Sequence, residues 1–219
     1  MTYLQLVNAV LRKLRENEVT TVNENDYSKL VGDFVNDAVK SVEAAWDWSS
    51  LRTDIDISTV NNTKTYPLTN FGIRGELMSL YNVSEKYEIR QRTKAYIKDK
   101  HYKDPDNSTG KPRYFAFDGT DVNNDTQVTF YPTPDAVYQV EANVVLRDTD
   151  LADDATATKL PTQPIVQLAF SYALRERGET GGQNAMEQSA IANQDLANAI
   201  ALDAGNNGGE LIFDVLYEK

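Results

Sequence analysis

The spacing of apolar residues predicts a short amphipathic helix at the start of the chain. The pattern begins near Thr2 and repeats every three or four residues, at Leu4, Val7, Leu11 and Leu14. This spacing places apolar side chains on one face of an α-helix, where they can pack against a neighbouring element.

A longer helix is predicted over residues 25–48. Its apolar positions keep the same spacing, and either Asn23 or Asn25 can cap its first turn. Trp46 falls on the apolar stripe. We therefore expect Trp46 in the core rather than on a ligand-binding surface.

The hydrophobic period changes to two after residue 53, which indicates β-strands. Residues 54–58 alternate strictly, and a polar turn separates them from residues 65–68, so a hairpin is predicted there. Further strands are predicted at 75–83, 87–90, 112–117, 126–131 and 138–146, with one short helix at about 93–102. Helices are too few for parallel crossovers, so the strands should be mostly antiparallel.

Helical spacing returns after Leu160-Pro161. Pro164 suits the first turn of a third long helix, which Gly178 would end. A fourth helix, from about Gln183 to Asp203, carries mostly small apolar residues that permit close packing against a neighbour.

These elements predict an α+β fold: a helical bundle formed by the N- and C-terminal helices, with an inserted antiparallel β domain and a flexible C-terminal tail. The expected boundaries are 1–50 for the first helices, 51–159 for the β domain, 160–204 for the last helices, and 205–219 for the hinge and tail. Neither helical pair can bury its apolar face alone. We therefore expect both pairs to pack into one bundle from which the β domain projects.

Composition excludes several kinds of chemistry. The chain of 219 residues has no cysteine and one histidine, which excludes disulfides, thiolate nucleophiles and zinc sites built on cysteine. The net charge of −11 argues against ordinary duplex-DNA binding, because Lys and Arg must neutralise phosphates. No apolar run approaches the roughly 18 residues of a membrane span, so no membrane association is expected.

Candidate catalytic and metal sites are weak. Asp54 and Asp56 alternate with isoleucines, which places both carboxylates on the solvent face of a strand. The oxygen-rich loop from Asp121 to Asp125 lacks the glutamate spacing of a calcium loop and is typical of a turn. His101 has no Ser or Asp motif beside it and is expected to be an ordinary exposed histidine. We predict no enzyme activity and no cofactor.

One stretch departs from the overall acidity. Between residues 86 and 103 there are seven basic residues, interleaved with tyrosines: Lys86, Arg90, Arg92, Lys94, Lys98, Lys100 and Lys103. Such a pattern can hold a nucleic-acid backbone or face an acidic partner. The rest of the chain is strongly acidic. An interface with another copy or a partner protein is therefore favoured over nucleic acid and over a merely solvated face.

The C-terminal segment is apolar and follows a Gly/Asn-rich hinge at residues 205–209. Its apolar residues are Leu211, Ile212, Phe213, Val215, Leu216 and Tyr217. A segment of this kind either joins its own sheet or inserts into another chain, and the hinge favours the second possibility.

The order of several short motifs resembles the head-to-tail adaptor (connector) proteins of tailed bacteriophages, the group that includes tail tubular protein A. The motifs are Tyr3-Leu4-Gln5-Leu6-Val7-Asn8, Ala45-Trp46-Asp47-Trp48, Phe130-Tyr131-Pro132-Thr133-Pro134, Leu160-Pro161 and Ala199-Ile200-Ala201-Leu202-Asp203.

This resemblance implies a structural virion protein without an active site, made in the host cytoplasm and located at the neck of the particle. It implies a homo-oligomeric ring, usually of twelve copies, that lies beneath the portal protein, extends the DNA channel and offers a docking surface to a tail or nozzle protein. DNA would pass through without specific binding, and residues 211–217 would engage the portal. The alternative from another class is a β-rich module that binds carbohydrate or a receptor, with Trp46, Trp48 and the tyrosines as a stacking platform. A hydrolase is a third possibility, which no carboxylate pair in the sequence supports.

Overall fold

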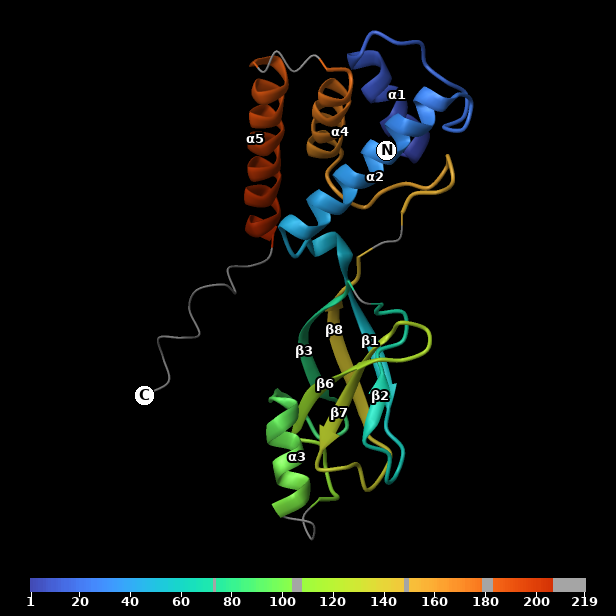
Figure 1. Ribbon diagram of the computed structural model, residues 1–219. Helices are drawn as coiled ribbons and strands as arrows, with labels where there is room; N and C mark the ends of the chain where they lie inside the picture. The colour runs from blue at the N-terminus through green and yellow to red at the C-terminus, as the bar shows by residue number, and fades with distance from the viewer. Residues whose placement is uncertain (73, 104–107, 148–149, 179–182, 207–219) are drawn as a thin grey trace. The chain divides into compact units, whose positions relative to one another are not determined.

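The computed structural model describes residues 1–72, 74–103, 108–147, 150–178 and 183–206. It divides into two compact units, one formed by Met1–Leu51 with Asp148–Lys219 and the other by Arg52–Arg147 (Figure 1). Helices form the first unit, and mostly antiparallel sheets form the second. The α+β class predicted from the sequence is therefore confirmed.

The helical unit contains α1 (Tyr3–Lys13), α2 (Asp26–Ala45), the short 3₁₀ helix η1 (Ser49–Leu51), α4 (Thr162–Glu176) and α5 (Gln183–Asn206). Helix α4 packs against α1, α2 and α5. The first turn of α1 is held by a capping box, in which the Thr2 hydroxyl accepts a hydrogen bond from the Gln5 amide and Gln5 Oε1 accepts one from the Thr2 amide. Asn25 caps α2 through Ser28 in the same way.

The end of α2 corrects the expectation for Trp46. The helix ends at Ala45 instead of residue 48, and Trp46 is half-buried, with its Nε1–H donating to Asp203 Oδ2 at 2.9 Å. Trp48 takes the core position instead, at 1% exposure. Its Nε1–H donates to the Val42 carbonyl at 2.7 Å. That carbonyl lies in the last turn of the helix, where no backbone amide is left to bind it.

The segment after the last strand belongs to the helical unit. The Tyr3 amide donates to the Thr156 carbonyl at 2.8 Å, and the Leu151 amide donates to Asn36 Oδ1 at 2.9 Å. Lys40 forms an ion pair with Asp150 at 2.8 Å. The β unit consequently ends at Arg147, earlier than the expected residue 159.

The β unit contains two four-stranded sheets. Their strands are β1 (Arg52–Ser58), β2 (Thr65–Pro67), β3 (Glu76–Asn82), β4 (Tyr87–Glu88), β5 (Arg90–Gln91), β6 (Tyr114–Thr120), β7 (Thr126–Tyr131) and β8 (Gln139–Val145). The orders are β1-β8-β3-β4 and β2-β7-β6-β5, antiparallel except for the β5/β6 pair. The predicted hairpin between residues 54–58 and 65–68 is wrong, because β1 pairs with β8 and β2 pairs with β7.

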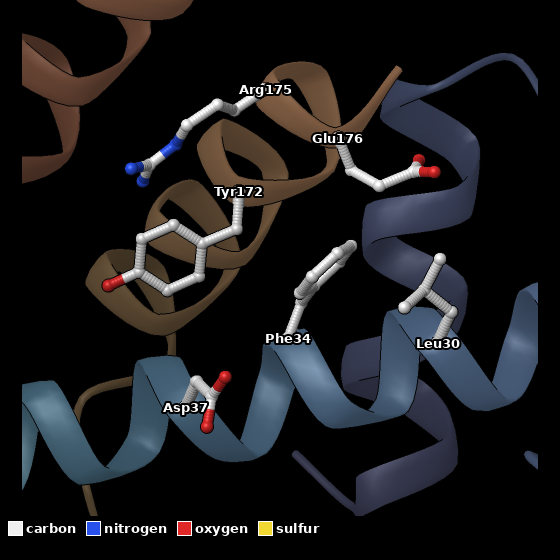
Figure 2. Close-up of a pocket in the computed structure, with 6 residues that line it drawn as sticks. All are labelled: Leu30, Phe34, Asp37, Tyr172, Arg175 and Glu176. Carbon is white, nitrogen blue, oxygen red and sulfur yellow. The ribbon is translucent and has the colours of Figure 1, made fainter. Parts of the chain in front are cut away.

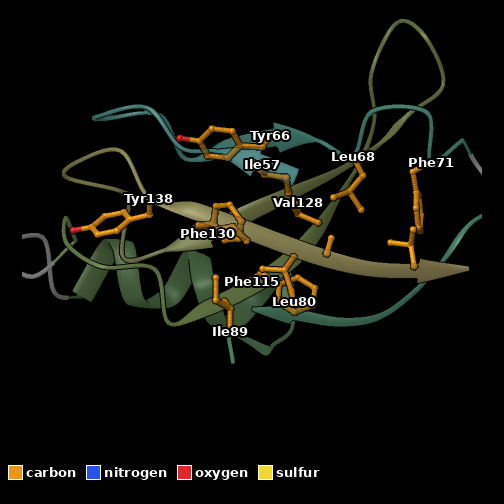
Figure 3. Close-up of a cluster of buried hydrophobic side chains, with 13 residues drawn as sticks. Ile57, Tyr66, Leu68, Phe71, Leu80, Ile89, Phe115, Val128, Phe130 and Tyr138 are labelled. Carbon is orange, nitrogen blue, oxygen red and sulfur yellow. The ribbon is translucent and has the colours of Figure 1, made fainter. Parts of the chain in front are cut away.

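The two sheets share one hydrophobic core (Figure 3). Ile57, Leu80 and Val140 enter it from the first sheet, while Tyr66 and Phe130 enter it from the second. Each sheet has one apolar face, and packing the two faces together removes both from water. This explains why β1 and β2 lie in different sheets although they are neighbours in sequence.

Helix α3 (Lys94–Lys103) packs against β6 and β7. Ile97, Ala116 and Tyr131 form a separate small cluster there. Ala116 and Tyr131 each follow a residue of the main core, and successive side chains of a strand point to opposite faces. Helix α3 therefore covers the outer face of the second sheet and carries four of the seven predicted basic residues.

Candidate interaction surfaces

The seven basic residues predicted as an interface all lie in the β unit. Lys86 is in the turn between β3 and β4, where its backbone has a positive φ of 58°. Arg90 is on β5 and Arg92 follows it, whereas Lys94, Lys98, Lys100 and Lys103 lie on α3. Six of the side chains are exposed, and that of Lys100 is half-buried.

Two tyrosine rings hold two of these cations in place. The Arg92 guanidinium lies 5.4 Å from the ring centre of Tyr114 and 5.8 Å from that of Tyr96. Lys100 Nζ lies over the Tyr96 ring, also at 5.8 Å. Cations over aromatic faces are attracted by the ring quadrupole, so these side chains are oriented without being neutralised.

One arginine of this surface was not among the seven predicted residues. Arg113 lies over the Tyr87 ring at 5.6 Å, and its carbonyl accepts a hydrogen bond from the Arg90 amide. The parallel pairing of β5 with β6, which places Arg90 beside Tyr114, brings these residues together. An Arg-Tyr pair at the start of a predicted strand was the available signal. We call Tyr87, Arg90, Arg92, Tyr96, Lys100, Arg113 and Tyr114 the basic tyrosine surface.

The nearby carboxylates are mostly paired with other lysines. Lys94 pairs with Asp118, Lys103 with Asp99 at 2.8 Å, and Lys111 with Glu85 at 2.6 Å. Hydrogen bonds from Lys94 and Thr129 hold the pKa of Asp118 below its ordinary value, so Asp118 stays ionised.

Between residues 86 and 113, six cations remain without an ion pair to any residue that the structure describes. They are Lys86, Arg90, Arg92, Lys98, Lys100 and Arg113. A pocket of about 340 Å³ opens between Tyr87, Glu88, Arg90, Arg113 and Tyr114. This part of the molecule can accept an anionic group.

The net negative charge falls outside the β unit. Thirteen of the 22 basic and thirteen of the 33 acidic residues lie between Arg52 and Arg147, so this unit has no net formal charge. The formal charge of −11 belongs entirely to the other unit. The chain therefore combines an acidic unit with a neutral unit that carries a local excess of exposed cations.

The helical unit has a groove between α2 and α4 (Figure 2). It has a volume of about 570 Å³ and is lined by Leu30, Phe34, Asp37, Tyr172, Arg175 and Glu176. Figure 2 shows Phe34 between Leu30 and Tyr172, which together form an apolar floor. Leu30, Phe34 and Tyr172 have the helical spacing of core residues, yet the structure leaves all three half-buried.

The charged residues of the groove are open to a partner. Arg175 lies over the Tyr172 ring at 5.5 Å and points away from Glu176 in Figure 2. Neither Asp37 nor Glu176 forms an ion pair with another described residue. The groove thus combines an apolar floor with two unpaired carboxylates.

The other candidate sites form no reactive centre. Asp54 and Asp56 are exposed, as predicted. Asp121 Oδ1 accepts hydrogen bonds from the amides of Asn123 and Asp125, which makes the loop a turn. Within the described residues there is no group of three or more side chains suited to a metal ion, and no helix is long and apolar enough to cross a membrane.

His101 differs from its prediction. It is half-buried rather than exposed, and its ring meets Tyr131 edge-on, with centres 5.0 Å apart. Burial, and then the charge of Lys64, lower the pKa of His101. The ring therefore packs in its neutral form.

The predicted portal-binding tail, Leu211, Ile212, Phe213, Val215, Leu216 and Tyr217, lies outside the described residues. The two tryptophans proposed as part of a stacking platform in the carbohydrate-binding alternative do not form an exposed pair. Trp48 is buried, and the indole of Trp46 is held by Asp203.

Comparison with known proteins assigns the chain to one protein family. A search among curated proteins found no significant match. The sequence model of the SU10 adaptor protein family matches residues 1–210, which is nearly the whole chain. The chain therefore belongs to the SU10 adaptor protein family and is a structural adaptor of a bacteriophage virion.

Proposed function

We propose that the protein is the head-to-tail adaptor of its phage and assembles as a ring of about twelve copies beneath the portal protein. The ring extends the DNA channel and offers a docking surface to a tail or nozzle protein. The family match over residues 1–210 is the observation that carries this proposal. No enzymatic step is part of this role.

The charge of the chain supports the passage of DNA. A lumen that is crossed by DNA should not bind phosphates, and acidic walls prevent binding by repulsion. The formal charge of −11 on the helical unit makes that unit the better candidate for the wall of the channel.

The basic tyrosine surface supports contacts between proteins. Tyrosine and arginine are enriched in protein interfaces, where stacked guanidinium groups can bind carboxylates through two hydrogen bonds. In this proposal the seven basic residues predicted from the sequence face a neighbouring copy or an acidic partner. They are Lys86, Arg90, Arg92, Lys94, Lys98, Lys100 and Lys103. Residues 211–217 bind the portal.

The direct test is mass photometry of the purified chain, alone and mixed with the portal protein of the same phage. The proposal predicts a particle of ring mass, or a portal that gains a complete set of copies. A chain that stays monomeric and does not bind portal at micromolar concentration would contradict it.

The role of the tail is tested by deleting residues 207–219, which leaves α5 intact. We expect unchanged thermal unfolding and loss of portal binding. Normal portal binding by the shortened chain would show that the tail assignment is wrong. A matched variant keeps the length of the segment and replaces Phe213 and Leu216 with serine. It shows whether portal binding depends on these apolar side chains or only on the length of the segment.

A further inference from the structure

Tyr102 on α3 is the most exposed aromatic side chain that the structure describes, at 84%. Ile97 anchors the opposite side of the helix in the small cluster with Ala116 and Tyr131. Lys98 lies one turn before Tyr102 on the same side, is exposed, and has no ion pair with a described residue. Helix α3 therefore presents an aromatic ring beside a free positive charge.

The groove between α2 and α4 has complementary properties. It is an open groove with a volume of about 570 Å³, which is ample for one tyrosine ring. Leu30, Phe34 and Tyr172 supply an apolar floor. Asp37 and Glu176 supply two carboxylates that are not paired within the described part of the chain. Arg175 supplies the one guanidinium of the lining and lies over the Tyr172 ring, so the lining is negative on balance.

We propose that Tyr102 of one copy inserts into the α2/α4 groove of the next copy, with Lys98 paired to Asp37 or Glu176. This inference rests on the proposed ring. The inserted side chain and the groove are different surfaces of the molecule. A repeated contact of this kind is head-to-tail and closes into a ring when its rotation allows.

The exposed face of α5 is a poorer occupant. It carries apolar side chains, including Met186 and Leu202 at 75% exposure each. However, α5 has no Lys or Arg, and its Glu187 and Asp195 would meet the like charges of Asp37 and Glu176. Charge complementarity therefore selects α3.

Photo-crosslinking tests the contact. The photoreactive residue p-benzoylphenylalanine replaces Tyr102, and copies with and without isotope labelling are mixed before assembly, with portal where assembly requires it. We expect crosslinks between labelled and unlabelled copies, in peptides that contain Leu30, Phe34 or Tyr172. The same photoreactive residue in place of Val122, which is 97% exposed on the loop between β6 and β7, should not mark those peptides.

Crosslinks confined to one copy, to portal, or to other peptides would overturn the inference. Rings that form without any crosslink from position 102 would do so as well, while leaving the proposed function intact. A chain that forms no ring with portal removes the proposed function, and the inference falls with it.

Charge exchange gives a second measurement. We expect Tyr102→Ala and Lys98→Glu each to raise the concentration needed for half-assembly about ten-fold. Tyr102→Phe should assemble normally, as should Tyr81→Ala, a control at another exposed tyrosine. Lys98→Glu should be rescued by Asp37→Lys or Glu176→Lys, and rescue by neither would contradict the pairing.

Discussion

At the scale of single residues, Gly32 fixes how closely α1 approaches α2. A Cβ at this position would lie 2.9 Å from Val22 Cγ1 and closer still to the hydroxyl of Tyr3. Both neighbours are buried, so neither can move without disturbing the core. A single methyl group at residue 32 is therefore too large for the site.

We expect Gly32→Ala to lower the free energy of unfolding by about 1–3 kcal/mol, although alanine is the better helix former. Urea denaturation measures the change. Gly205→Ala on α5 is the matched control, because a Cβ there meets open space and should stabilise the helix by up to about 1 kcal/mol. Equal effects of the two variants would contradict the close contact.

The lowered pKa of His101 predicts that the free energy of unfolding depends on pH. Its pKa is lower in the folded chain than the ordinary 6.5, because burial disfavours the charged ring. The stability that this ring contributes is therefore complete above pH 6.5 and is lost as the pH falls through the folded pKa.

Urea denaturation at about pH 7.5 and about pH 5 measures this loss. His101→Phe keeps an aromatic ring against Tyr131 and removes the titration, so the variant should lose less stability in acid than the parent. An identical loss in both proteins would show that other groups cause it.

At the scale of elements, one carboxylate joins the end of α5 to the segment after α2. Asp203 accepts hydrogen bonds from Trp46 Nε1 at 2.9 Å, from the Ser49 amide at 3.1 Å and from the Ser49 hydroxyl at 2.5 Å. Hydrogen bonds to an ionised acceptor are stronger than neutral ones, so these three contacts should restrain the last turns of the helix.

We expect Asp203→Ala to lower the free energy of local opening by roughly 2 kcal/mol. Hydrogen exchange with mass spectrometry should show faster exchange in the last turns of α5 and no change in α4. Asp195→Ala is the control, because its contact with Gln163 is long, at 3.4 Å, and exposed. Equal exchange in both variants would mean that Asp203 does not hold the helix.

The sequence predicted the helices well because their pattern is local. The helix predicted over residues 93–102 is observed at Lys94–Lys103, and the last helix begins at Gln183 as expected. The predicted strand pairing was wrong because the alternation around Ile57 or Tyr66 marks an apolar face of a strand. It does not indicate which other strand lies beside it. That partner is β8 for one strand and β7 for the other, far away in sequence.

The candidate surfaces were predictable only where they are continuous in sequence. The basic residues from Lys86 to Lys103 are continuous in sequence, whereas Arg113 joins them only through the pairing of β5 with β6. The α2/α4 groove was missed because Leu30 and Phe34 have the spacing of core residues. Whether such residues are covered depends on the distance between two helices, which periodicity does not encode.

At the scale of the whole molecule, the charges of the two units differ, and the contacts between proteins should depend on salt. The β unit has no net formal charge but exposes unpaired cations, while the other unit carries −11. Screening shortens the range of such attraction from about 10 Å at 0.1 M salt to about 3 Å at 1 M.

We therefore expect ring assembly to weaken as NaCl rises from about 0.1 M to about 1 M. Mass photometry at each concentration measures the fraction of rings. A variant with Arg92→Gln and Arg113→Gln should assemble less well at low salt and depend less on salt. Assembly that strengthens with salt would point to apolar contacts as the main attraction.

Electron cryomicroscopy of the purified chain bound to the portal protein of its phage would show whether this adaptor forms a ring on the portal. We expect a closed ring of about twelve copies, coaxial with the portal, with an open channel along the axis. Single copies scattered on the portal surface, or a portal without any bound chain, would contradict it.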